Sequence, residues 1–185
     1  MIVPRVFVTG IGIITSIGYN AKEVLHSLVN KKTGIGKISH IESVYANEIP
    51  AAEIAASNNE LMSLAECRDQ GTFTRTALLG IIASKQAVNN AKLTPDDLVD
   101  AAIISGTTVG GMDRSEIFYK SYNKNRNSGR LRDVIGHDCG DSTERMANHL
   151  GIKGFLSTIN TACSSSANAI MLAARMIKAG KIKRA

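Results

Sequence analysis

The 185-residue sequence has no tryptophan, only three prolines and few aromatic residues, which make up 4% of the chain. The aromatic side chains on which single-stranded nucleic acids stack are therefore scarce, and no zinc-finger or RNA-recognition pattern is present. We expect no nucleic-acid partner, although 22 Lys and Arg against 16 Asp and Glu give a net charge of +6. That charge suits a solvated surface or an acidic protein partner.

Cysteines are also few: Cys67, Cys139 and Cys163 show no paired spacing and no CxxC motif. An odd number without a secretory signal predicts a reducing, cytoplasmic setting. No histidine pair has metal-ligand spacing with a third ligand, so we expect no metal. The apolar residues 6–18 are too few and too rich in glycine to span a bilayer, and we expect no membrane association.

Hydrophobic patterning predicts an α/β domain in which buried strands alternate with helices, an order typical of a mainly parallel sheet. Strands are expected at residues 6–14, 101–105 and 155–160, and loops with short helices at 39–71. Helices are expected over 21–30, 73–92, 114–124 and 142–150, at Thr94-Pro95-Asp96-Asp97 with Thr94 as the N-cap, and from the Cys163 region to Gly180.

The last helix is apolar nearly all round, with Ala167, Ile170, Met171, Ala174 and Ile177 on one stripe. Such a helix must be covered on nearly all sides, which requires a middle layer. The sequence then ends where a new strand would begin. We therefore expect it to be a fragment whose partner half is missing.

Cys163 stands where a predicted strand passes directly into this helix. The free N–H groups and the positive dipole end of a helix stabilise a thiolate there, and they can hold the oxyanion that forms when a thioester is attacked. We therefore interpret Cys163 as a catalytic nucleophile. Cys67 and Cys139 lack this setting and are interpreted as structural.

Four motifs in the correct order resemble those of elongating ketoacyl synthases and polyketide ketosynthase domains. The run Thr161-Ala162-Cys163-Ser164-Ser165-Ser166 resembles the active-site signature. The loop Ser105–Gly111 is similar to a family glycine loop. Val8–Gly12 with Ser16-Ile17-Gly18, and Lys32-Thr33-Gly34-Ile35, resemble two further turns. Gly71–Arg75 departs from the basic segment of many members, so no carrier-docking role is assigned to it.

This resemblance implies a thiolase-like fold, with residues 1–185 as the ketoacyl synthase N-terminal domain. That domain would form half of a five-layered α/β/α/β/α sandwich with a mostly parallel mixed sheet. Cys163 would accept an acyl chain from the phosphopantetheine of an acyl carrier protein, and malonyl-carrier protein would then condense with it. No other cofactor is implied. Val109 resembles the residue that gates the acyl pocket.

The resemblance also implies that decarboxylation needs two histidines and a lysine of the second half, so residues 1–185 alone should not condense. The pathway would be fatty acid or polyketide-type biosynthesis, in a homodimer or a ketosynthase-like heterodimer. Alternatives are a thiolase-like acyltransferase using coenzyme A thioesters, a non-catalytic ketosynthase-like subunit, and an α/β binding module with an inert Cys163. Gly10-Ile11-Gly12 lacks the third glycine of a dinucleotide fingerprint, and His137-Asp138 suggests a loop hydrogen bond rather than a site.

Overall fold

The computed structural model describes residues 5–68 and 73–185, and its contacts divide the chain into two compact units. The first holds residues 5–8, 73–81 and 93–185, and the second holds residues 9–68 and 82–92. Helix α3 (Arg75–Asn90) runs from the first unit into the second. Within the described ranges, no helix is both long and apolar enough to cross a bilayer.

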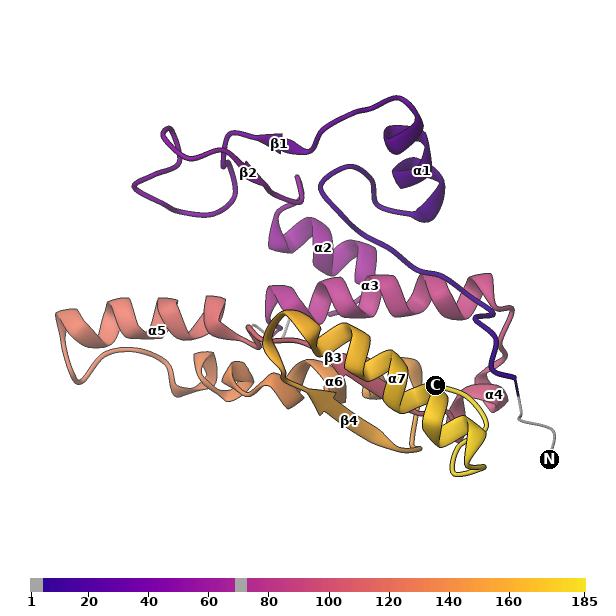
Figure 1. Ribbon diagram of the computed structural model, residues 1–185. Helices are drawn as coiled ribbons and strands as arrows, with labels where there is room; N and C mark the ends of the chain where they lie inside the picture. The colour runs from indigo at the N-terminus through magenta and orange to yellow at the C-terminus, as the bar shows by residue number, and fades with distance from the viewer. Residues whose placement is uncertain (1–4, 69–72) are drawn as a thin grey trace. The chain divides into compact units, whose positions relative to one another are not determined.

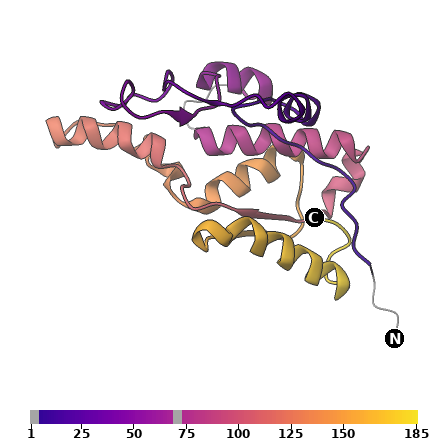
Figure 2. The same ribbon diagram turned by 45° about the horizontal axis from the view of Figure 1, so that its top comes forward.

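A parallel pair of strands forms the centre of the first unit. β3 (Ile103–Gly106) pairs with β4 (Leu156–Ile159), with Gly106 opposite Ile159. Figure 2 shows the strands between helix α6 (Cys139–Leu150) and helix α7 (Ser165–Lys178), so that one helix covers each face. The two predicted strands and their parallel pairing are confirmed.

Two helices of the first unit begin at capping side chains. α4 (Pro95–Val99) follows Thr94, which exchanges hydrogen bonds with Asp97 in a capping box, and α6 follows Asp138, whose carboxylate accepts the N–H of Gly140. α5 (Met112–Lys124) extends away from the strands in Figure 1, and two 3₁₀ turns follow it. These turns are η1 (Leu131–Asp133) and η2 (Ile135–His137).

α7 is covered less completely than its sequence predicts. One side packs on β3 and β4, and Ala169 is buried there. Ile170, however, is 70% exposed and Met171 is 43% exposed. Burial on nearly all sides is therefore not reached within the described residues, because only the sheet side of this helix has a neighbouring layer.

The second unit holds α1 (Ala21–Val29), the antiparallel pair β1 (Ile35–Gly36) and β2 (Ala51–Ala52), and α2 (Asn58–Ala65). The stretch predicted as loops and short helices thus contains one strand and one helix, while residues 69–71 at its end lie outside the described residues. α2 begins with a capping box between Ser57 and Glu60.

The predicted strand at residues 6–14 is wrong: the chain forms no strand there. Side chains of α3 take the place of a neighbouring strand, since Asn90 accepts the N–H of Ile11 at 3.0 Å and Gln86 accepts that of Ile13 at 3.1 Å. A Cβ on Gly12 would lie 1.8 Å from the carbonyl oxygen of Ala83. This glycine therefore serves close packing on α3.

Candidate active site

Cys163 lies in a sharp turn between β4 and α7. The strand ends at Ile159, a single 3₁₀ turn η3 (Ala162–Ser164) follows, and α7 begins at Ser165. Ala162 has a φ of 52°, a left-handed conformation that non-glycine residues rarely adopt. The Cys163 side chain is exposed, and it precedes the N-terminus of a 14-residue helix by two positions.

Hydroxyl groups around Cys163 hold the turn in this conformation. The Ser165 hydroxyl donates to the Ala162 carbonyl at 2.7 Å and accepts the N–H of Thr161 at 2.9 Å. The Ser164 hydroxyl donates to the Thr161 carbonyl at 2.7 Å. The Asn168 amide, one turn into α7, donates to the Thr161 hydroxyl at 2.8 Å. These hydrogen bonds join residues before Cys163 to residues after it, so they hold the backbone of the turn that carries the sulfur.

The loop with Val109 leaves the same edge of the sheet. Because β3 and β4 are parallel, their carboxyl ends meet, and the N–H of Thr107 donates to the Ile159 carbonyl at 3.2 Å. The carboxyl edge of parallel strands is where ligands of α/β proteins bind. Val109 is 54% exposed. The two residues predicted as a site therefore occupy adjacent loops.

A part-buried chain of three hydroxyls, centred on the buried Thr143, ties both strands to α6. The Thr143 hydroxyl lies 2.6 Å from that of Ser105 on β3 and 2.6 Å from that of Thr158 on β4. Thr143 itself is 2% exposed. Buried hydroxyls bonded in this way hold the strand ends, and hence the two loops, at one spacing.

The other two cysteines differ from Cys163. Burial favours the uncharged thiol of Cys67 and raises its pKa. The positive charge of Lys85 opposes this shift but does not cancel it. Cys139 is the first residue of α6, and its sulfur accepts a hydrogen bond from the Asn160 amide at 3.5 Å. That contact brings the start of α6 next to the residue that follows β4.

His137 and Asp138 do not act as a pair. The Nδ1 atom of His137 lies 2.9 Å from the Ser115 hydroxyl, whereas Asp138 caps α6. Both side chains thus make local structural hydrogen bonds, as expected. His137 and Ser115 also line a pocket of about 510 Å³ together with residues of α5 and Val134.

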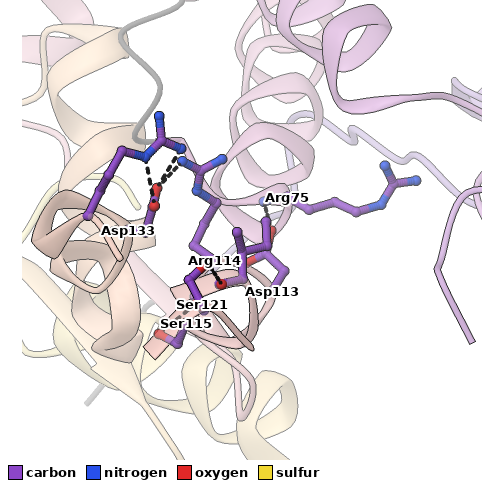
Figure 3. Close-up of polar contacts among 9 residues, drawn as sticks. Arg75, Asp113, Arg114, Ser115, Ser121 and Asp133 are labelled. Carbon is purple, nitrogen blue, oxygen red and sulfur yellow. Dashed lines mark hydrogen bonds and ion pairs between the residues drawn. The ribbon is translucent and has the colours of Figure 1, made fainter. Parts of the chain in front are cut away.

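The first turn of α5 makes polar contacts that the sequence did not predict. Arg114 forms an ion pair of 2.5 Å with Asp133, which is 3% exposed and also binds Arg130 at 3.1 Å. Figure 3 shows Arg114 and Asp133 pointing toward each other. Asp113 accepts the N–H of Arg75, at the start of α3, at 2.9 Å. The hint in the sequence was the charged pair Asp113-Arg114 shortly after Gly110-Gly111.

No group of three or more potential metal ligands lies together in the described part of the chain. An exposed thiol two residues before a helix N-terminus, such as that of Cys163, can take part in acyl transfer through sulfur.

Comparisons with known proteins give one consistent result. The family model described as "Beta-ketoacyl synthase, N-terminal domain" matches residues 4–185. A 3-oxoacyl-[acyl-carrier-protein] synthase 2 of Synechocystis is 26% identical over 185 residues, covering 97% of this chain and 43% of that protein. The synthase of the same name from Staphylococcus aureus is 29% identical over 182 residues, covering 95% and 43%. The chain thus spans less than half the length of these relatives.

Among solved structures, the ishigamide ketosynthase/chain length factor matches 95% of this chain and 44% of its own chain, with a TM-score of 0.84 and 22% identity. A beta-ketoacyl synthase from Burkholderia phymatum matches with a TM-score of 0.72 and 15% identity, at the same coverage of both chains. The expected thiolase-like α/β fold is confirmed by these matches. The expected resemblance to ketoacyl synthases is confirmed by the family match.

Proposed function

Since this chain belongs to the beta-ketoacyl synthase family, as its N-terminal domain, we propose that Cys163 is the acyl-accepting nucleophile of a 3-oxoacyl-[acyl-carrier-protein] synthase. The observation that carries the proposal is the exposed position of Cys163 in the fixed turn before α7. Backbone N–H groups at the start of that helix can stabilise the oxyanion that forms when a thioester is attacked.

The reaction has two steps. The Cys163 thiolate attacks the carbonyl carbon of an acyl-carrier thioester, and the tetrahedral intermediate expels the carrier thiolate, leaving acyl-Cys163. A malonyl-carrier thioester then loses carbon dioxide, and the resulting carbanion attacks the acyl-Cys163 carbonyl. A carbon–carbon bond forms, the Cys163 sulfur leaves as a thiolate, and the product is a 3-oxoacyl chain two carbons longer. The groups that promote decarboxylation belong to the second half of the enzyme.

Acyl carrier protein is proposed as the partner that brings both substrates on phosphopantetheine, because the curated relatives carry it in their names. We place the reaction in the cytoplasm, a reducing compartment in which cysteine thiols persist. The protein is proposed to act as a homodimer or with a ketosynthase-like subunit, in keeping with its structural similarity to a ketosynthase/chain length factor. Val109, exposed in the loop beside the Cys163 turn, is proposed to gate the acyl pocket.

Mass spectrometry of the intact protein after incubation with acyl carrier protein thioesters tests the assignment. The mass of one acyl group should appear on the peptide that contains Cys163. Cys163→Ser should abolish the adduct, and Cys139→Ser should retain it. An adduct that persists in the Cys163 variant, or none in the unmodified protein, would reject the proposed nucleophile.

Two alternatives have distinct outcomes in the same assay. A thiolase-like enzyme would be acylated faster by acyl-coenzyme A than by the carrier thioester. A non-catalytic subunit would acquire no acyl group from either donor. Addition of malonyl-carrier protein should yield 3-oxoacyl product from the intact enzyme and none from residues 1–185 alone.

A further inference from the structure

The turn that follows Val109 is enclosed on two sides by backbone and side chains of other elements. The Gly110 carbonyl accepts a hydrogen bond from the Thr76 hydroxyl of α3 at 2.8 Å. A Cβ on Gly111 would lie 1.8 Å from the carbonyl oxygen of Gly136 in η2, an approach that only glycine allows. A glycine pair is flexible in isolation, but here its surroundings leave it little room to move.

The first turn of α5, which continues this loop, has separate anchors to separate elements. Asp113 binds the start of α3, as described above, and Arg114 binds Asp133 of η1. Ser115 binds His137 of η2. Three consecutive side chains thus hold the start of one helix against three neighbours, two of which also touch the glycine turn.

Val109 itself depends on this frame. Its side chain is 54% exposed, so packing constrains it only in part. Its N–H lies 3.4 Å from the Thr107 hydroxyl, within its own loop. The position of Val109 is therefore set by the backbone on either side: β3 before it, and the anchored turn of α5 after it.

We propose that the first turn of α5, anchored through Arg114 and Ser115, positions Val109 and thereby sets which acyl chain lengths reach Cys163. This inference rests on the proposed function. A shift of about 1 Å at a site wall alters reaction rates strongly, and one methylene in an apolar pocket changes selectivity roughly 10–200-fold. Arg114 and Ser115 do not touch the reacting atoms, so they are positioning residues.

Ser115→Ala is the sharpest test because a matched control lies on the same helix. The Ser121 hydroxyl donates to the Ile117 carbonyl of the same helix at 3.3 Å, whereas the Ser115 hydroxyl lies 2.9 Å from the Nδ1 atom of His137 in η2. Rates of Cys163 acylation would be measured for the intact protein with carrier thioesters of short, medium and long saturated chains. Figure 3 shows both serines on α5.

Ser115→Ala should change the ratio of long-chain to short-chain acylation rates by about fivefold or more, with Ser121→Ala unchanged. Asp133→Asn, which weakens the ion pair of Arg114, should shift the ratio in the same direction; if that variant does not fold, Ser115→Ala decides alone. Equal ratios in Ser115→Ala and the unmodified protein, or an equal shift in Ser121→Ala, would overturn the inference. An unmodified protein that is never acylated at Cys163 would instead reject the proposed function.

Discussion

Gly106, the last residue of β3, lies directly against the first residue of α7: a Cβ on Gly106 would come within 2.6 Å of the carbonyl carbon of Ser165. The absence of a side chain at this point lets the strand end touch the start of the helix. The loop that carries Val109 and the turn that carries Cys163 are neighbours for this reason.

Gly106→Ala should therefore destabilise the intact protein by about 1–3 kcal/mol, the usual cost of forcing an extra carbon into packed backbone. Urea unfolding would measure the loss, and acylation of Cys163 should slow because the start of α7 must move. Gly36→Ala is the matched control, since a Cβ on that strand residue meets nothing within 4 Å. An equal effect of the two variants would contradict the steric account.

Ala162 is a second position at which backbone geometry limits which side chains the turn can accept. Glycine adopts its φ of 52° readily and alanine tolerates it, but this backbone conformation is unfavourable for a β-branched residue. Ala162→Val should destabilise the protein by about 1–2 kcal/mol and slow alkylation of Cys163, while Ala162→Gly should stay within about 1 kcal/mol. Ala167→Val, at an exposed helical position, is the control for the added methyl groups. Unchanged stability and an unchanged alkylation rate in Ala162→Val would show that the turn is not constrained.

Much of the first unit could be predicted because its signals are local. The apolar period of α3, the Thr94-Pro95 start of α4 and the short apolar runs of β3 and β4 each depend on neighbouring residues. Cys163 could be placed at the start of a helix for the same reason. Two of the confirmed helices, α4 and α6, also begin at a capping side chain.

The missed features depend on partners far apart in the sequence. A β-branched run at residues 6–14 predicts a strand, yet the N–H of Ile11 bonds to the side chain of Asn90, 79 residues later. The ion pair of Arg114 joins residues 19 apart across a polar loop, and no periodic pattern marks it. Exposed Ile170 also differs from prediction, because burial depends on layers as well as on the helix itself.

Thr143 supplies a third prediction, on the spacing of the two strands. Thr143→Val keeps the shape of the side chain and removes both hydrogen bonds of 2.6 Å, to Ser105 and Thr158. Leaving the part-buried hydroxyls of Ser105 and Thr158 without this partner should lower the free energy of unfolding in urea by about 1–3 kcal/mol. Thr108→Val, at an exposed position of the neighbouring loop, should change stability by less than about 0.5 kcal/mol. A similarly small loss of stability in Thr143→Val would show that the chain of three hydroxyls does not hold the strands.

Glu53 of the second unit gives a prediction on pH dependence. Burial alone would raise the pKa of its carboxyl, but hydrogen bonds from the backbone and hydroxyl of Ser39 and from the N–H groups of His40 and Ile41 outweigh it and lower the pKa from 4.5 to about 2. Because the folded pKa lies below the unfolded one, this stabilisation is present above pH 4.5 and is lost as the pH falls toward 2. Glu53→Gln should lower stability at pH 7 by on the order of 1 kcal/mol, discounted for solvent screening, and flatten the acid side of the stability curve. Urea unfolding between pH 7 and 3 would measure both effects, with Glu48→Gln in the loop between β1 and β2 as control. An unchanged acid slope in Glu53→Gln would contradict the assignment.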